Sequence, residues 1–430
     1  MGSADRDHLG RPVVVVTGTG VLTSLGTGKA DNWRALTAGH SGIRRISRFP
    51  IAGLRTNIAG TVDFVPVEEQ SAPGLSERLA ELVIDEAVAE AGIGAPGDFP
   101  GPMFLALPPV EMEWPQRLAM VKASGAAASG ANATVSYDDL LRAAATGKFT
   151  RYYERFLFGS VAEHLADRFG TKGSPVATST ACASGATAIQ LGVEAIRRGE
   201  ADAALVCGTD ASVNPESLIR FSLLSALSTR NDPPQAAARP FSKDRDGFVM
   251  AEGAGALVLE SLAHAKARGA TILSVVEGCG EMADGFHRTR SSPDGKPIIA
   301  CMQHALDDAG LAPDAIGYIN AHGTGTPEND KMEWVAVSAV FGGRAASIPI
   351  SSNKSMIGHT LTAAGTVEAI FTLLSMRHGR LPPTINYATP DPALPLDCVP
   401  NVARDAQVAH ALSNSFGFGG QNVCLVMGLP

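Results

Sequence analysis

Long hydrophobic runs, paired cysteines and clusters of basic residues are all missing from this 430-residue chain. No segment reaches the roughly 18 consecutive apolar residues that a membrane-spanning helix needs. The N-terminal segment MGSADRDHLGRPVVVV contains charges but only a very short apolar run, unlike a secretory signal peptide. These absences predict a cytoplasmic protein that makes no use of a membrane.

The cysteines are few and form no CxxC pair, which excludes the usual zinc and disulfide scaffolds. The formal net charge is -8, and the absence of a Lys/Arg run argues against a nucleic-acid-binding protein. That charge still allows a local basic patch for an acidic partner. With 45% hydrophobic and 18% charged residues, the composition is that of a soluble globular protein with a large core.

Short apolar runs alternate with amphipathic segments along the whole chain. The first half predicts strands at 11–18, 102–108, 202–208 and 255–260, one more before Thr180, and helices at 29–39, 76–92, 157–168 and after Cys182. The second half predicts strands at 270–280, 316–320 and 348–351, two more within 412–428, and helices at 296–309, 330–341 and 362–377. This alternation implies a largely parallel α/β sheet with helices on its faces. Residues 109–150 are expected to form loops and short helices at one edge.

The stretch STACASGATAIQLGVEAIRRG places Cys182 where a helix begins. A lone cysteine is usually a small packing residue. At the first turn of a helix, free backbone N–H groups and the helix dipole favour the thiolate. We therefore expect Cys182 to be a nucleophile with a lowered pKa.

Three further stretches carry candidate chemistry: YINAHGTGTPENDKMEW (318–334), SSNKSMIGHTLTAAGTVEAI (351–370) and SNSFGFGGQN (413–422). A metal site built from His322 and His359 is possible in principle, but the chain has no HExxH spacing and the two histidines lie in separate turns. The segment VTGTGVLTSLG lacks the third glycine of a dinucleotide fingerprint and the acidic residue expected after it. A nucleotide cofactor is therefore disfavoured.

Together, TACASG, NAHGTGTPENDK, NKSMIGHTLTAAG and NSFGFGG resemble, in order and spacing, the motifs of the β-ketoacyl-acyl-carrier-protein synthases of the thiolase superfamily, close to the elongating type II enzymes. The resemblance covers essentially the whole chain and is weakest at about 105–150. It implies a thiolase-like α/β fold: a duplicated, five-layered αβαβα arrangement with mixed sheets. The N-terminal half, 1–265, would carry the nucleophilic cysteine, and the C-terminal half, 266–430, the two histidines.

The resemblance implies a decarboxylative Claisen condensation. Cys182 would take an acyl group from a carrier thioester, with the backbone N–H groups of Cys182 and Phe418 holding the oxyanion. His322 and His359 would stabilise the enolate formed when malonyl thioester loses carbon dioxide. The substrates would be carried on the phosphopantetheine of an acyl carrier protein, and no metal or redox cofactor would be needed.

Further roles follow from the same resemblance. Lys354 matches an essential lysine and is expected to pair with Glu333, and Asp330 is expected to support the site. Thr324 and Thr326 match threonines that contact the phosphopantetheine arm.

The glycine-rich turn near the C-terminus matches a gating segment. Phe418 corresponds to the phenylalanine that moves on acylation, and Gly419 contributes to the freedom of its turn. His287 falls in a loop near the expected entrance, and its role is open.

Four alternative functions fit the sequence less well. A thiolase would need a second cysteine where this chain reads SFGFGG, and an initiating synthase would have Asn in place of His359. A non-catalytic chain-length partner would lack Cys182, and a carrier-binding scaffold would have no reason to retain Lys354 beside these residues. Fatty acid elongation is the expected pathway. The segments LPPVEMEWPQR, HGTGT and GGQN keep open a pathway-specific enzyme for very-long-chain or polyketide acyl groups.

The expected partners are a second copy of the chain and an acyl carrier protein. The apolar strand within SPVATSTA (174–181) lies where relatives form a homodimer. Carrier proteins are acidic, so docking calls for basic residues near the entrance. Lys148, Arg151 and Arg155 are predicted to contribute, because their spacing places them on one face if the segment is helical.

Overall fold

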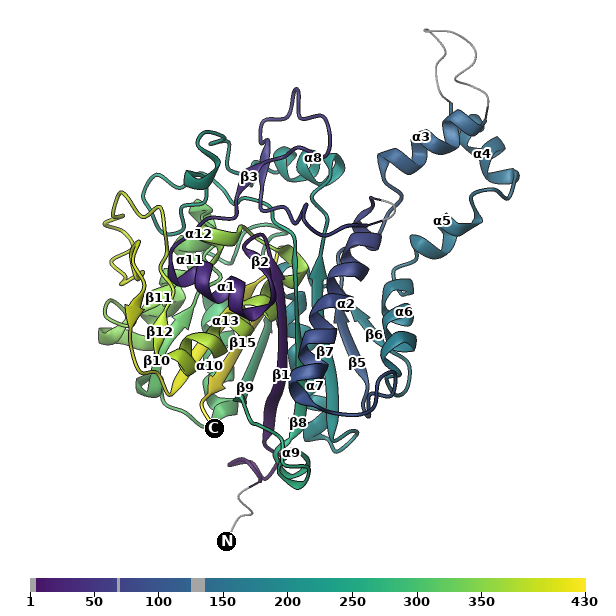
Figure 1. Cartoon of the computed structure of the whole chain (residues 1–430). Coiled ribbons are helices and arrows are strands. Elements are labelled where there is room, and N and C mark those ends of the chain that lie inside the picture. Colours follow the sequence, from purple (N-terminus) through teal and green to yellow (C-terminus); the bar gives the residue numbers. More distant parts are fainter. Residues whose placement is uncertain (1–4, 68–69, 125–135) are drawn as a thin grey trace.

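Residues 5–67, 70–124 and 136–430 are described in the computed structural model of the chain (Figure 1). Ten strands form one continuous path, in the order β11-β10-β14-β15-β9-β1-β8-β7-β5-β6, and β2 (Gly26–Thr27) pairs with β1. The first-half strands are β1 Val14–Thr23, β5 Met103–Ala106, β6 Val176–Thr178, β7 Ala203–Asp210 and β8 Gly253–Ser261. The second-half strands are β9 Ser274–Ala283, β10 Ile316–Asn320, β11 Ile350–Ser351, β14 His410–Phe416 and β15 Gln421–Gly428.

The two sets of five strands repeat in order and direction. Starting from β1 or from β9, the first two neighbours are antiparallel and the next two are parallel. The sheet is therefore mixed, and the expectation of a largely parallel sheet is wrong. The alternation of strands and helices implied crossover helices between parallel strands. Strands β8 and β15 instead run antiparallel to β7 and β14, the strands before them, and an antiparallel pair needs no crossover helix. The division of the chain at residue 265 stays a prediction.

Two buried helices lie between the halves of the sheet: α7 (Ser184–Arg197) and α13 (Ala364–His378). Strands β1 and β9 pair over only three residue pairs, which leaves room for these helices. Alternate residues of β8 face opposite sides, because strand side chains alternate. Leu257 and Leu259 join the core around α7 and α13, whereas Ala256 and Val258 join the core under α2 (Ala72–Ala91).

The other half is built in the same way. Val423 and Leu425 of β15 face the central helices, whereas Cys424 and Val426 face α10 (Lys296–Ala309) and α11 (Pro327–Phe341). The result is five layers: helices, sheet, central helices, sheet, helices. This arrangement is the thiolase-like architecture expected from the motifs.

Most expected elements are present, and caps explain the shifted helix starts. Helix α10 and strand β10 have the predicted bounds. Helix α11 starts at Pro327 rather than 330, because the Thr326 side chain caps it by accepting from the Asn329 N–H. Helix α2 starts at Ala72 rather than 76, since Ser71 caps it and Pro73 lies in its first turn. Helix α1 covers Gly28–Thr37.

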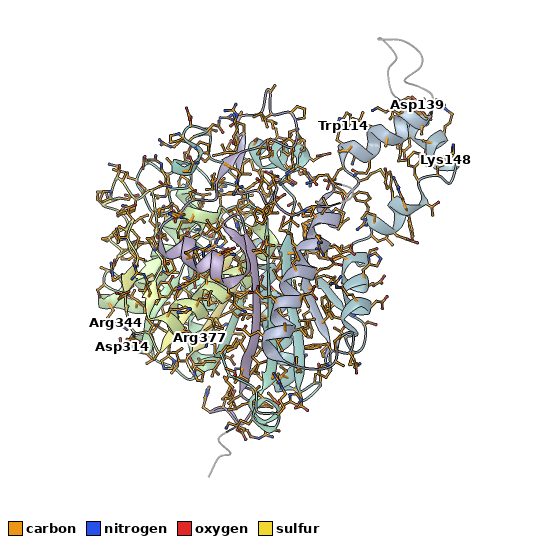
Figure 2. All side chains as sticks on the ribbon, in the orientation of Figure 1. Trp114, Asp139, Lys148, Asp314, Arg344 and Arg377 are labelled. Atoms are coloured by element: carbon orange, nitrogen blue, oxygen red, sulfur yellow. The ribbon has the colours of Figure 1, made fainter. Side chains whose placement is uncertain are left out.

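An arm extends from the body after β5. Helices α3 (Trp114–Ala123), α4 (Tyr137–Ala145) and α5 (Thr150–Arg155) form it, and α6 (Ser160–Phe169) returns to the sheet (Figure 1). Asp139 and Lys148 lie on this arm, away from the main body, whereas Trp114 lies where the arm begins (Figure 2). Short helices at one edge are what the sequence predicted for 109–150. None of the helices in the described ranges is long and apolar enough to cross a membrane.

Candidate active site

Cys182 lies in a tight bend between β6 and α7. Ala181 adopts a φ of +50°, and residues Ala181–Ala183 form a 3-10 turn that leads into α7. The Ser184 hydroxyl accepts from the Thr180 N–H (2.8 Å) and donates to the Ala181 carbonyl (2.6 Å). A left-handed alanine is strained, so these two hydrogen bonds help hold the cysteine at the turn.

A second bend of the same form precedes α13. Leu361 has a φ of +46° and begins the 3-10 turn Leu361–Ala363, and His359 stands two residues earlier. Helices α7 and α13 approach so closely here that only glycine fits at the contact. A Cβ on Gly365 would lie 2.2 Å from the Ala186 nitrogen. The repeated bends bring Cys182 and His359 to the same place.

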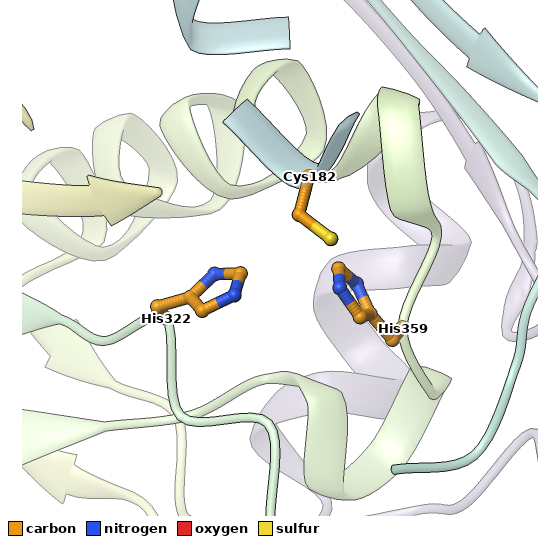
Figure 3. A group of neighbouring side chains, drawn as sticks. All are labelled: Cys182, His322 and His359. Atoms are coloured by element: carbon orange, nitrogen blue, oxygen red, sulfur yellow. The ribbon is translucent and has the colours of Figure 1, made fainter. Parts of the chain in front are cut away.

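Cys182, His322 and His359 converge in space (Figure 3). Their nearest ligand atoms all lie within 4.8 Å of one another, and all three side chains are buried. The two imidazole rings are 5.4 Å apart between centroids and almost perpendicular, at 82°. His322 follows β10, so three segments that are distant in sequence build this cluster.

Both imidazoles are neutral at pH 7. Burial lowers the pKa of each histidine well below its ordinary value, and the Lys354 charge lowers both pKa values further. The Nδ1 atom of His359 accepts from the Leu361 N–H at 3.3 Å. The ring proton of His359 therefore sits on Nε2, which is buried and has no hydrogen-bond partner in the described part of the chain. This N–H is free to donate to a substrate oxygen.

The cysteine thiol is also neutral. Burial raises the pKa of Cys182 to about 11, whereas the Lys354 charge and the Phe418 backbone N–H act in the opposite direction. The expectation that the helix start lowers this pKa is therefore wrong in net direction, because desolvation is the larger effect.

Lys354 pairs with Glu368, not with Glu333. The Lys354 Nζ and the Glu368 carboxylate form a buried ion pair, which corrects the sequence-based expectation. Glu333 instead accepts from the backbone N–H groups of His322 and Gly323, each at 2.8 Å, and from the Asn414 amide at 2.9 Å. Glu368 lies in α13, after His359. Its role as the partner of Lys354 is visible only in the structure, where α13 packs against the lysine.

The loop that carries His322 is held by a second carboxylate. Asp330 accepts from the N–H groups of Phe241 (2.8 Å) and Gly325 (3.1 Å). The hydroxyls of Thr324 and Thr326 are 2.9 Å apart and face the cavity in front of Cys182. Thr324 and Thr326 thus lie on the loop after β10, and Asp330 and Glu333 lie in α11, which follows that loop.

Two cavities meet at Cys182. An entrance cavity of about 490 Å³ contains both histidines, both threonines and His287 in its wall. A second cavity of about 450 Å³ runs from Cys182 between the start of α2, the 108–113 segment and α8 (Pro215–Leu223). Phe418 lines both cavities, and Gly419 lies beside it in the turn between β14 and β15.

The expected carrier-docking residues lie on the arm. Lys148 precedes α5, so it does not share a helical face with Arg151 and Arg155 as predicted. Arg155 is also occupied by an ion pair with Glu77 at 2.8 Å, and the Arg151 guanidinium lies 5.3 Å from the centre of the Tyr152 ring.

Other cations surround the entrance. Arg288, Arg290 and Lys331 are exposed at the entrance cavity, and none of them forms an ion pair within the described ranges. Two of these cations, Arg288 and Arg290, lie in the segment FHRTR, which also contains His287.

Three side chains of the site could together ligate a metal ion. Among the described residues, Cys182, His322 and His359 are the only group of potential ligands close enough to hold an ion. Sulfur and imidazole donors suit zinc. The expectation that no metal takes part stays a prediction.

Comparisons with known proteins agree over almost the whole chain. The family descriptions "Beta-ketoacyl synthase, N-terminal domain" and "Beta-ketoacyl synthase, C-terminal domain" match residues 114–265 and 273–388. A 3-oxoacyl-[acyl-carrier-protein] synthase 2 of Vibrio cholerae is 38% identical over 96% of this chain and 98% of its own. The tetracenomycin polyketide synthase ketoacyl synthase alpha subunit of Streptomyces glaucescens is 37% identical over 97% of each chain.

Solved structures give the same picture. One is a type II polyketide synthase acyl-carrier protein in complex with its ketosynthase. The matching chain has a TM-score of 0.83 and 33% sequence identity, and the match covers 98% of this chain and 100% of that one. The ishigamide ketosynthase/chain length factor matches with a TM-score of 0.82 and 35% identity over the same shares.

Proposed function

Because the chain belongs to the β-ketoacyl synthase family, we propose that it joins an acyl group held on Cys182 to a malonyl group on acyl carrier protein. The products are β-ketoacyl carrier protein, carbon dioxide and free carrier protein. One observation carries this proposal: a buried thiol lies within 4.8 Å of two neutral imidazoles, where two cavities meet.

The first step is acyl transfer. The Cys182 sulfur attacks the carrier thioester, a new C–S bond forms, and the pantetheine thiol leaves with the proton that Cys182 gives up. The neutral imidazoles are close enough to relay that proton. The N–H groups of Cys182 and Phe418 stabilise the oxyanion, and the N–H of Phe418 already acts on the sulfur.

The second step is decarboxylation and condensation. Malonyl thioester loses carbon dioxide, and its carbonyl oxygen becomes an enolate that needs hydrogen-bond donors. His359 supplies its free Nε2–H, and His322 acts beside it. The enolate carbon attacks the acyl-Cys182 carbonyl, the thioester C–S bond breaks, and the cysteine sulfur leaves as a thiolate that takes up a proton from solvent. Glu333, Asp330 and the Lys354–Glu368 pair position these groups.

Fatty acid elongation is the first candidate pathway, and a type II polyketide or other specialised pathway is the second. Relatives named for each pathway match at 38% and 37% identity. The second candidate is supported by the structural match to a polyketide ketosynthase with its carrier protein. Both pathways use the same condensation.

The protein is further proposed to act as a cytoplasmic homodimer. Strand β6 lies at the end of the sheet path, and its Val176 side chain is 41% exposed. Docking of the carrier at Arg288, Arg290 and Lys331 is proposed because these cations surround the entrance to Cys182.

The test follows the acyl group. Wild-type protein is incubated with acyl carrier thioester, and the adduct is mapped by mass spectrometry; we expect it on Cys182, with none in Cys182→Ser. His322→Ala and His359→Ala should still acylate but should decarboxylate malonyl carrier protein about 10²–10³-fold more slowly. An adduct on another cysteine, or wild-type decarboxylation in both histidine variants, contradicts the proposal.

A further inference from the structure

The bend that precedes α13 lacks the serine that holds the bend of Cys182. In that first bend the Ser184 hydroxyl accepts from one backbone N–H and donates to one backbone carbonyl. The matching residue of the second bend is Ala364, which has no hydroxyl. Leu361 of the second bend nevertheless has a φ of +46°, a strained conformation for a residue with a side chain. Another group must therefore hold this bend.

Asp210, the last residue of β7, reaches the second bend from outside. Its Oδ2 atom accepts from the Thr362 backbone N–H at 3.1 Å and lies 2.8 Å from the Thr362 hydroxyl, which also reaches the Thr209 carbonyl at 2.9 Å. Its Oδ1 atom accepts from the N–H of Ser212 at 2.9 Å and from the hydroxyl of the same residue. The first N–H groups of a helix have no partner within it, and a carboxylate suits them. Asp210 therefore caps the bend from another strand.

Water does not compete for these hydrogen bonds. Asp210 is only 1% exposed and Thr362 only 3%. A buried hydrogen bond that is lost is not replaced by solvent, so the groups left behind must move or stay unpaired. The two residues are 152 positions apart in the chain, and together they join the end of β7 to the start of α13.

The bend in turn fixes the imidazole of His359. The Leu361 N–H donates to Nδ1 of this ring at 3.3 Å, which keeps the ring proton on Nε2. Backbone hydrogen bonds of His359 with Val249 (2.7 Å) and Ala251 (2.9 Å) hold its main chain but not its ring. If the bend relaxes, the Leu361 N–H moves away from Nδ1, and the Nε2–H is no longer held ready for a substrate oxygen.

We propose that Asp210 is a positioning residue for His359, and that it acts through Thr362 by holding the bend between β11 and α13. This inference rests on the proposed function, because the direction of the His359 Nε2–H matters only if that N–H donates to the enolate oxygen. Neither Asp210 nor Thr362 has to touch the reacting atoms. The expected consequence is a selective effect on decarboxylation, the step that uses this N–H.

The test changes the threonine and leaves the carboxylate in place. Thr362→Val removes the hydroxyl but keeps the side-chain shape, whereas Thr362→Ser keeps the hydroxyl. Transfer of an acetyl group from acetyl carrier protein to Cys182 is measured by mass spectrometry, and decarboxylation of malonyl carrier protein by carbon dioxide release. We expect Thr362→Val to lower kcat for decarboxylation about tenfold, about the worth of one hydrogen bond, with KM and acetyl transfer almost unchanged. Thr362→Ser should stay close to wild type.

Thr17→Val is the matched control. The Thr17 hydroxyl also donates to a buried carboxylate, that of Glu260, and both residues lie outside the walls of the two cavities. This variant should lose stability in urea unfolding but decarboxylate at the wild-type rate. The inference is overturned if Thr362→Val decarboxylates like wild type, if Thr362→Ser is as slow as Thr362→Val, or if Thr17→Val slows equally.

A double-mutant cycle tests whether the two residues act together. Only decarboxylation is compared, because the Asp210 charge also acts on Cys182. Asp210→Asn should slow decarboxylation at least as much as Thr362→Val, and the double variant should be no slower than Asp210→Asn alone. Losses that multiply in the double variant would mean that the residues act independently, which overturns the inference.

A further variant separates this inference from the proposed function. If Thr362→Val does not fold, Thr362→Ala replaces it with the same expected result. If the wild-type protein decarboxylates malonyl carrier protein and Thr362→Ala matches it, this inference alone fails. If the wild-type protein neither takes up the acetyl group nor decarboxylates, the proposed function fails, and this inference fails with it.

Discussion

Burial sets the chemistry of Cys182 more strongly than its place at a helix start. A desolvated thiol holds its proton, and the Phe418 N–H and the Lys354 charge only partly offset that effect. The resting enzyme therefore has a protonated, protected thiol, and its proton must be removed as the sulfur attacks the thioester carbonyl. Such a thiol resists oxidation and stray alkylation at neutral pH.

The pH dependence of alkylation tests this state. Because the pKa of Cys182 is raised to about 11, its thiolate fraction should increase about tenfold per pH unit below that value. The rate of iodoacetamide labelling, followed on the Cys182 peptide, should rise throughout the range from neutral pH to pH ~10. The Cys182→Ala variant controls for labelling elsewhere. A plateau near neutral pH would show instead that the helix start dominates.

Mutation can show which glutamate, Glu368 or Glu333, pairs with Lys354. Removing one member of the buried Lys354–Glu368 pair leaves an uncompensated charge and should cost about 3–5 kcal/mol of unfolding free energy. In urea unfolding, Lys354→Met and Glu368→Gln should couple strongly in a double-mutant cycle, whereas Lys354→Met and Glu333→Gln should be closer to additive. If Lys354→Met instead couples strongly with Glu333→Gln and is additive with Glu368→Gln, Lys354 pairs with Glu333.

Lys354 also affects the histidines. Its charge lowers the pKa of His322 and His359, so Lys354→Met should raise both pKa values. Since the neutral imidazole is the active form, decarboxylation by a variant that still folds should be lost at a higher pH on the acid side than in wild type. An unchanged acid limb in the pH–rate profile would contradict this role.

At the scale of elements, the active site depends on how closely α7 and α13 approach. Each helix follows a 3-10 turn with one left-handed residue, Ala181 or Leu361, and the helices meet through Gly185 and Gly365. The stretches STACASG and HTLTAAG therefore have matching backbone geometry, although only one carries a cysteine. These two stretches are only partly alike in sequence, but their backbone geometry repeats closely.

The glycine contact gives an element-scale prediction. A Cβ on Gly365 would lie 2.2 Å from the Ala186 nitrogen, so Gly365→Ala must push the two helices apart. We expect a loss of at least about 1–3 kcal/mol in urea unfolding and a sharp fall in Cys182 acylation. Gly343→Ala is the control, because a Cβ there meets nothing within 4 Å. Equal stability of the two variants would show that the helices do not need this contact.

At the scale of the whole molecule, the end of the sheet path is the expected dimer contact. Light scattering should give about twice the 44.5 kDa chain mass. Val176→Asp, on β6, should shift the protein towards monomer, whereas Val402→Asp, at a residue 73% exposed on the other half of the chain, should not. A wild-type protein that is both monomeric and fully active would refute the dimer.

The carrier-docking surface is the second whole-molecule question. Reversing two charges among Arg288, Arg290 and Lys331 should raise KM for acyl carrier protein, more so at low salt, with little effect on a small acyl-pantetheine. Reversing Lys148 and Arg151 provides the matched control on the arm. A larger effect from the arm variants would show that the carrier protein docks on the arm, near α5.

Much of the site could be predicted from the sequence, because its chemistry lies in short motifs. The order of most strands and helices follows from local patterns of apolar, glycine and capping residues, and Cys182, His322 and His359 lie in short motifs that resemble those of the β-ketoacyl synthases. The single failure in strand direction arose because alternation along the chain does not specify which strands become neighbours. Lys148 was misplaced because α5 begins only at Thr150.

Tertiary structure alone decided which groups meet. The sequence by itself determined a two-part α/β chain with a thiol and two imidazoles at glycine-rich turns. Only packing brought Glu368 rather than Glu333 to Lys354, buried Cys182 deeply enough to raise its pKa, and closed Glu113 and Ser217 around a second cavity. The physical reason is that burial and ion pairing depend on distances between segments far apart in the chain, which no local pattern encodes.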